Sequence, residues 1–294
     1  MSPSAESFAQ VGEIELCWQR FGEPDAPPLL MIMGLGAQMI LWPDGLCQLL
    51  ADRGFGVIRF DNRDAGRSTV LTDAGAPSIS QALAGEVGQA PYTLSDMAAD
   101  AAGLLDALGI EQAHVLGSSL GGMVAQTLAI ERPERVLSLA SLMSTTGDRE
   151  VGQPTPAGLE ALTTAPPTDR AGYIEATVRA RAMIGSPGFP RDEERARDLA
   201  GRMYDRGYHP DGTMRQVVAI LASGDRTPLL RELDVPTVVI HGEDDALIGV
   251  SGGHATAAAI PGSRLVLIPG LGHDLPAGSW ETIADAVVAN RFAR

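Results

Sequence analysis

The chain contains no lysine, because all 22 of its basic residues are arginine. This absence excludes Schiff-base catalysis, a pyridoxal-binding lysine and the lysine of a P-loop. No apolar run approaches the roughly 18 residues that a membrane-spanning helix needs. The first residues include Glu6 and Glu13 and have neither a basic cluster nor an apolar core. No secretory signal is therefore predicted, and a cytoplasmic location is expected.

Cysteine and positive charge are also scarce. Cys17 and Cys47 have no metal-ligand spacing and lie in apolar patterns, which favours buried structural thiols over a disulfide. The formal charge is −15, and a surface so negative repels phosphate backbones and anionic lipids. Nucleic acid and membranes are therefore not expected partners. No motif implies a metal or another cofactor, and nothing indicates an oligomer, so a small molecule is the expected partner.

The 294 residues suit one large α/β domain. Short, continuously apolar runs alternate with helical patterns, which indicates a parallel sheet covered by helices on both faces. Strands are predicted at 14–22, 27–34, 55–63, 113–117, 135–145, 235–245 and 262–273, and helices at 42–54, 93–110, 120–134 and 279–292.

This alternation stops between residues 146 and 225. That segment has no clear apolar strand but several polar, arginine-rich helical stretches, such as 191–207. The sequence therefore predicts an α/β core made of residues 1–145 and 226–294. A helical cap, or lid, of residues 146–225 is expected to be inserted after the sixth strand.

The pattern G-x-S-x-G occurs twice, centred on Ser119 and on Ser251. A nucleophilic serine of this kind needs a strand before it and a helix after it, joined by a sharp turn. Only Ser119 has that context, since Ser251 follows a loop. The neighbouring Ser118 would place Leu116 and Leu120 where the glycines belong, and their side chains would crowd the turn. Ser119 is therefore the predicted nucleophile.

A serine hydroxyl needs a general base, and the base needs an acid that orients it. Of the five histidines, His273 ends the stretch 262–273, in the glycine-lined loop "PGLGH" that follows its apolar run, and functional groups of parallel sheets gather at the carboxyl ends of strands. Within the stretch 235–245, the acid is expected after the apolar run "VPTVVI", where Glu243, Asp244 and Asp245 are the candidates. The chain order Ser, Asp, His is the one expected for a sheet of this kind.

Five motifs in order give the chain a resemblance to the α/β-hydrolase fold superfamily over nearly its whole length. "MG" after the third strand, "LWPD", "VIRFDNRDAGRS", "HGEDD" and "GLGHDLP" are similar to a bacterial group that includes aclacinomycin methylesterase-like hydrolases. The resemblance implies an eight-stranded, mostly parallel sheet with a helical cap. It also implies a Ser119–His273–Asp245 triad, with Asp244 as the alternative acid, and it implies no cofactor.

The resemblance also implies an oxyanion hole, in which two N–H groups stabilise the charge on a substrate carbonyl. The expected donors are the backbone N–H of Leu120 and that of Leu35, which follows Gly34. Most relatives carry His-Gly where this chain has Met33 and Gly34. A change of side chain leaves the backbone N–H in place, so Met33 is expected to affect the geometry of the loop rather than its hydrogen-bond donors.

Further residues are candidates for the wall of the substrate site. They are Gly34, Gln38, Trp42, Ser118, Met143, Met183 and Tyr204. A place in the core is an equal alternative for Trp42, and internal packing of the cap is the alternative for Met183 and Tyr204. The charged turn at 61–68 is expected to brace the floor of the site.

Together these features predict a serine carboxylesterase that hydrolyses a small to medium carboxylic ester through an acyl-enzyme. A cofactor-free haloperoxidase or perhydrolase and a C–C bond hydrolase use the same triad and remain alternatives. A ligand receptor with the same fold is a remote alternative. Serine at position 119, where haloalkane dehalogenases of this fold have Asp, argues against dehalogenation.

Overall fold

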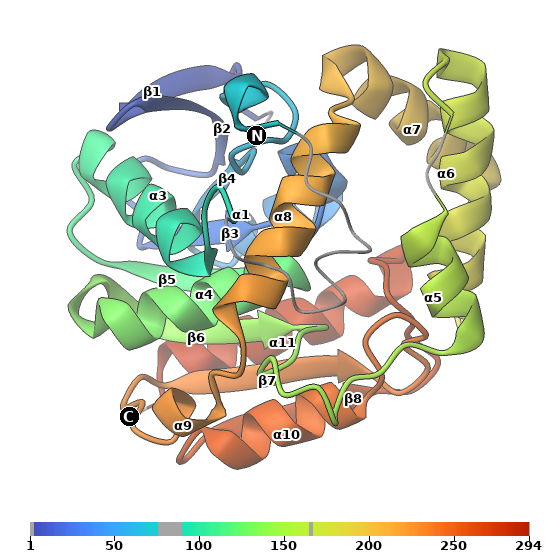
Figure 1. The fold of residues 1–294 in the computed structure, drawn as a ribbon. Helices are drawn as coiled ribbons and strands as arrows, with labels where there is room; N and C mark the ends of the chain where they lie inside the picture. Colours follow the sequence, from blue (N-terminus) through green and yellow to red (C-terminus); the bar gives the residue numbers. More distant parts are fainter. Residues whose placement is uncertain (1–2, 76–89, 165–166, 294) are drawn as a thin grey trace.

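The computed structural model describes residues 3–75, 90–164 and 167–293. Its strands form one eight-stranded sheet in the order β1-β2-β4-β3-β5-β6-β7-β8 (Figure 1). β1 and β2 pair in antiparallel fashion and β2 is antiparallel to β4, whereas every other pair is parallel. The strands are β1 (Ser7–Val11), β2 (Ile14–Phe21), β3 (Pro28–Ile32), β4 (Gly56–Phe60), β5 (Ala113–Ser118), β6 (Val136–Leu142), β7 (Thr237–Gly242) and β8 (Arg264–Ile268). The predicted eight-stranded, mostly parallel sheet is confirmed.

Helices cover both faces of this sheet, so its inner strands are buried on both sides. One face packs against α1 (Asp44–Asp52) and α11 (Trp280–Arg291), and the other against α3 (Leu94–Ala107), α4 (Leu120–Glu131) and α10 (Ser251–Ala259). Shorter helical turns lie at Met39–Leu41, Thr72–Ala74, Pro133–Arg135, Thr227–Leu230 (α9) and Ala277–Ser279.

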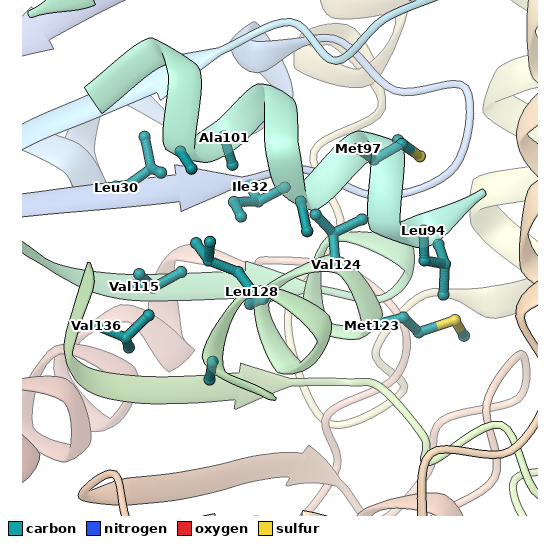
Figure 2. Close-up of a cluster of buried hydrophobic side chains, with 14 of the residues drawn as sticks. Leu30, Ile32, Leu94, Met97, Ala101, Val115, Met123, Val124, Leu128 and Val136 are labelled. Atoms are coloured by element: carbon teal, nitrogen blue, oxygen red, sulfur yellow. The ribbon is translucent and has the colours of Figure 1, made fainter. Parts of the chain in front are cut away.

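β3 shows how one strand serves two cores. Leu30 and Ile32 point toward α3 and α4, where Figure 2 shows them among Val115, Val124 and Leu128. The alternate residues of β3 point to the opposite face, toward α1 and α11. Successive side chains of a strand point to opposite faces, so a continuous apolar run fills both cores.

Among the described residues of the segment 146–225, which lies between β6 and β7, four helices are formed. They are α5 (Pro156–Thr163), α6 (Arg170–Ile184), α7 (Glu193–Gly207) and α8 (Pro210–Ser223). In Figure 1 the arrows of β6 and β7 point toward α5, and α8 crosses in front of the sheet. Met203 of α7 packs with Met39 and Ile40 of the core, and Arg206 pairs with the buried Asp61. The end of α7 is therefore attached to the α/β core.

Both cysteines are buried and free. Burial raises the pKa of Cys17 and that of Cys47 to about 12 in each case. The thiols therefore stay protonated and poorly nucleophilic at neutral pH, as the interpretation of structural cysteines requires. Among the helices of the described residues, none has the length and apolar character that crossing a membrane requires.

A buried ion pair joins α8 to the charged turn after β4. Arg215 donates to both carboxylate oxygens of Asp64 at 2.7 and 2.8 Å, and Tyr92 and the Leu71 N–H donate to the same carboxylate. Burial alone would raise the pKa of Asp64, but these donors hold it below its ordinary value. These contacts attach the charged turn to α8, and its support of the floor of the site stays a prediction.

We expect Arg215→Met to lower the free energy of unfolding by about 3–5 kcal/mol, because Asp64 would be left charged and buried. Urea denaturation measures this. The control Arg197→Met removes two exposed ion pairs, those with Glu175 and Glu193, and should change the free energy of unfolding far less, because solvent screens exposed charges. Since the folded pKa of Asp64 is lowered, its contribution is present above the unfolded pKa of about 3.9 and is lost as pH falls through the folded pKa. Equal losses in the two variants would contradict this account.

Candidate active site

Ser119 lies at a strained turn between β5 and α4. Its backbone has φ 57° and ψ −123°, and it is one of three non-glycine residues with positive φ in the described part of the chain. Such a conformation costs on the order of 1–3 kcal/mol and persists only where the surroundings enforce it. Here the Ser119 N–H donates to Leu142 O at 2.9 Å, and Ser144 Oγ donates to Ser119 O at 2.8 Å. The neighbouring strand therefore holds the turn.

The two glycines of the pattern are required by close packing. A Cβ on Gly117 would lie 2.1 Å from Gly121 O, and one on Gly121 would lie 2.0 Å from Ile32 O. Both distances are impossible for a side chain, so the strand and the helix approach closely only because these residues are glycine. Ser118, by contrast, is the last residue of β5 and is only 4% exposed.

The second match of the pattern has none of these features. Ser251 is an exposed first residue of α10, and its hydroxyl accepts a hydrogen bond from the Gly152 N–H. It is absent from the described residues with positive φ. The structure thus gives the strained turn to Ser119 alone of the two.

His273 is joined to Asp245. Its Nδ1 lies 2.7 Å from Asp245 Oδ2, while Asp245 Oδ1 accepts from the N–H groups of Leu247 and Ile248 at 2.9 Å each. Burial alone would raise the pKa of Asp245, but His273 and these donors keep it below its ordinary value. An ionised carboxylate only accepts hydrogen bonds, so the proton of a neutral His273 sits on Nδ1 and its Nε2 carries the lone pair.

The other two acid candidates are exposed. Asp244 Oδ2 accepts from the Gly270 N–H at 3.0 Å, so it braces the turn that follows β8. No hydrogen bond or ion pair joins Glu243 to a histidine within the described ranges. Of the three, Asp245 is the carboxylate that contacts His273.

Three of the remaining four histidines have hydrogen bonds that assign them structural roles. His114 is buried against Ser138, and burial lowers its pKa to about 4. His209 bonds Gly66 O, and His254 is exposed. His241 is fully buried, with Nε2 2.8 Å from Ile248 O and 3.6 Å from Asp245 Oδ2. Burial lowers the pKa of His241, so it stays neutral behind Asp245.

The loop after β3 lies against Ser119. A Cβ on Gly34 would lie 3.1 Å from Ser119 Cβ and 3.6 Å from Ser119 Oγ. Within the part of the chain that the structure describes, neither the Leu35 N–H nor the Leu120 N–H donates a hydrogen bond. The Leu120 N–H is free because the first N–H groups of a helix have no intrahelical partner, and the Leu35 N–H follows the glycine that lies against Ser119, so both are available to a ligand. They are the two donors named from the sequence.

One contact of the expected triad is missing. Among the described residues, no hydrogen bond joins Ser119 Oγ to His273. Both residues follow parallel strands at the same edge of the sheet, and His273 is 9% exposed. Catalytic hydrogen bonds are often long without substrate and shorten in the complex, so this geometry does not remove His273 as a candidate base.

The structure places several candidate pocket residues in the interior. Trp42 is 0% exposed within the core beneath α1, so the core interpretation of this residue replaces the pocket interpretation. Gln38 is 3% exposed, and its amide nitrogen donates to Met203 O and Gly207 O. It therefore links the loop after β3 to α7 rather than facing a substrate. Met143 is 2% exposed, with φ 48°.

Two candidates lie on the helices of the segment 146–225. Tyr204 packs against Tyr173 and Tyr208, and its hydroxyl donates to Thr168 O at 2.8 Å. Internal packing thus accounts for Tyr204. Met183 is half-buried, one residue before the end of α6.

That end of α6 touches the histidine loop. The His273 N–H donates to Ile184 O at 2.7 Å, and the Gly272 N–H donates to Ser186 Oγ at 2.9 Å. The segment between β6 and β7 therefore contacts the loops of both His273 and Leu35. Sequence reasoning missed these contacts, because no local pattern marks a backbone carbonyl that will meet a loop some ninety residues away.

No group of three or more His, Cys, Asp or Glu side chains in the described ranges could hold a metal ion. A surface hollow bordered by Arg20, Gly56 and Leu137 lies at the amino-terminal ends of the parallel strands. It contains none of the candidate residues, which all follow the carboxyl ends.

Comparison with known proteins agrees with this architecture. Residues 27–276 match the family described as the alpha/beta hydrolase fold. The chain is 28% identical to rhodomycin D methylesterase of Streptomyces peucetius, with 96% of each chain covered. It is 26% identical to a hydrolase from Pseudomonas aeruginosa, with a TM-score of 0.70 and coverage of 98% and 99% of the two chains.

An enol-lactonase from Burkholderia xenovorans is also similar, at 25% identity and a TM-score of 0.72, with 97% and 99% of the chains covered. The expected resemblance to methylesterases is confirmed by the relative from Streptomyces. The family match extends over most of the chain and includes β3 to β8. The chain therefore belongs to the family of proteins with the alpha/beta hydrolase fold.

Proposed function

We propose that this chain is a serine carboxylesterase with Ser119, His273 and Asp245 as its catalytic triad. The observation that carries the proposal is the surroundings of Ser119: a strained serine at the start of α4, with two unpaired backbone N–H groups beside it. The hydrogen bond between His273 and Asp245 at the same edge of the sheet supports it. The methylesterase and enol-lactonase relatives support an ester as the substrate.

In the proposed mechanism, Nε2 of His273 takes the proton of Ser119 as Oγ attacks the ester carbonyl. Asp245 holds the ring with its proton on Nδ1 and stabilises the imidazolium that forms. The N–H groups of Leu35 and Leu120 bind the oxyanion. The alcohol leaves with a proton from His273, and the same histidine then activates the water that releases the acid.

The segment 146–225 is proposed to act as the cap. Its α6 contacts the loop of His273, and its α7 and α8 contact the loop of Leu35. It therefore reaches two of the loops that carry the proposed chemistry. The alcohol and acyl preference of the enzyme would follow from these helices, because the α/β core supplies the reacting groups.

A panel of p-nitrophenyl esters with acyl chains of two to about twelve carbons, and methyl esters followed by titration of released acid, tests the proposal. We expect turnover that falls to background in Ser119→Ala. Peracid formation from acetate and hydrogen peroxide at a higher rate than ester hydrolysis would favour the perhydrolase alternative. Preferred cleavage of a vinylogous 1,5-diketone would favour C–C hydrolysis. Binding without turnover of any ester would contradict the proposal.

A further inference from the structure

The loop that carries Leu35 is flexible by composition. Gly34 and Gly36 flank Leu35, and Gly36 has φ 60° in the left-handed region. The peptide that joins Gly34 to Leu35 can reorient at little steric cost, and reorientation would turn the Leu35 N–H out of the direction that the proposed oxyanion hole needs. Something outside the loop therefore has to hold it. The Gly34 C=O, which belongs to the same peptide as the Leu35 N–H, accepts only a 3.2 Å hydrogen bond from Ala37 among the described contacts.

A glutamine from α8 provides a direct restraint. The Gly36 N–H donates to Gln216 Oε1 at 2.8 Å, and Gln216 Nε2 donates to Arg63 O at 2.8 Å. The two contacts assign the amide orientation, because one needs an acceptor and the other a donor. Gln216 is 0% exposed, so no water competes for either bond. A burial of this kind makes the bond to Gly36 stronger than it would be at the surface.

A second side chain fixes the other end of the same stretch. Asn62 Nδ2 donates to Met33 O at 2.9 Å. The carbonyl of Met33 and the N–H of Gly36 are thus each held, and the peptide between Gly34 and Leu35 lies between them. The loop is also close to α8 itself, since a Cβ on Gly36 would lie 2.6 Å from Thr213 Oγ1.

We propose that Gln216 is a positioning residue that holds the Leu35 N–H toward the oxyanion, so that docking of α8 completes the oxyanion hole. The inference rests on the proposed function and extends it, since it gives the cap a part in the chemical step. It also explains how the loop keeps its shape with Met33 in place of the usual histidine. Gln216 acts through the loop and touches no reacting atom.

Gln216→Met keeps the size of the side chain and removes both hydrogen bonds. An oxyanion donor is worth about 10²–10³ in rate, and a displacement of about 1 Å costs about 10². We expect kcat toward a p-nitrophenyl ester to fall about 10- to 100-fold, with KM changed less than about threefold. Inhibition by phenylboronic acid, whose tetrahedral adduct on a serine carries the oxyanion charge, should weaken by a similar factor.

Asn290→Leu is the matched control, because Asn290, like Gln216, is a buried amide with two hydrogen bonds to the backbone. Its nitrogen donates to the carbonyls of Leu139 and Pro236. It lies on α11, on the other face of the sheet. We expect it to lower stability while leaving kcat within about threefold. Equal kcat losses in the two variants, or an unchanged kcat in Gln216→Met, would overturn the inference.

Amide hydrogen exchange of the wild-type chain keeps the inference testable if Gln216→Met does not fold. The Gly36 N–H should be protected, and the Leu35 N–H should gain protection when phenylboronic acid binds. Rapid exchange of the Gly36 N–H would overturn the inference. A wild-type chain that hydrolyses no ester would instead overturn the proposed function, so the two failures are distinguishable.

Discussion

Ser119→Ala should lower kcat/KM for an ester by on the order of 10⁴-fold or more. The residual rate comes from the oxyanion donors and from binding, which survive the loss of the nucleophile. A 10⁴-fold loss corresponds to about 5.5 kcal/mol of transition-state stabilisation. Alanine keeps the strained backbone position without adding bulk, so we expect the variant to fold. Initial rates with a p-nitrophenyl ester and a urea denaturation curve measure both quantities.

Ser251→Ala is the control for this experiment, because Ser251 occupies the same place in the second G-x-S-x-G match. It should keep ester turnover within about twofold. A Ser119→Ala variant with wild-type turnover would show that the strained turn serves another purpose.

Asp245→Asn should lower kcat by about 10⁴-fold. The Oδ1 of an asparagine still accepts hydrogen bonds from the N–H groups of Leu247 and Ile248, so the loop can keep its shape. Its amide nitrogen then faces His273 Nδ1 and donates to it, which forces the ring proton onto Nε2. The histidine is left in the wrong tautomer to accept the serine proton, a change that costs about 10⁴ in a serine protease triad.

Asp244→Asn is the matched control, since it changes a neighbouring carboxylate in the same chemical way. The side-chain oxygen of the asparagine can still accept the hydrogen bond that the Gly270 N–H donates to Asp244 in the wild type. We therefore expect kcat within about threefold of the wild type. Comparing the two variants decides which of Asp244 and Asp245 is the acid of the triad, a choice that the sequence left open. A large loss in Asp244→Asn with a small one in Asp245→Asn would reverse their roles.

Much of the fold could be predicted from the sequence, because continuous apolar runs mark strands that are buried on both faces. β3 and β7 lie inside the predicted ranges 27–34 and 235–245. The edge strand β1 was not located, since "SFAQV" has neither a regular alternation of polar and apolar residues nor a continuous apolar run. An edge strand is covered on one side only, and its pattern is too short to stand out.

Some residues of the candidate site could likewise be predicted from the sequence, and others could not. Ser119 and His273 could each be predicted from a short motif whose own residues are neighbours in the sequence. The choice between Asp244 and Asp245 needed burial, which differs between adjacent residues only because the loop turns between them. Gln216 was missed, because its partner Gly36 is 180 residues away and nothing in a polar helix marks one glutamine. Such contacts depend on how α8 docks on the core.

The most direct test of the account is covalent labelling by an organophosphate such as diethyl p-nitrophenyl phosphate, followed by mass spectrometry. With no lysine in the chain, and with Arg132 followed by a proline that blocks cleavage, trypsin leaves Ser118 and Ser119 together in one peptide, residues 68–135, so fragmentation within that peptide has to locate the adduct. The account predicts one diethylphosphoryl group per chain, on Ser119, with loss of ester turnover in proportion to labelling. An adduct on Ser118 or Ser251, or full turnover in the labelled protein, would contradict it.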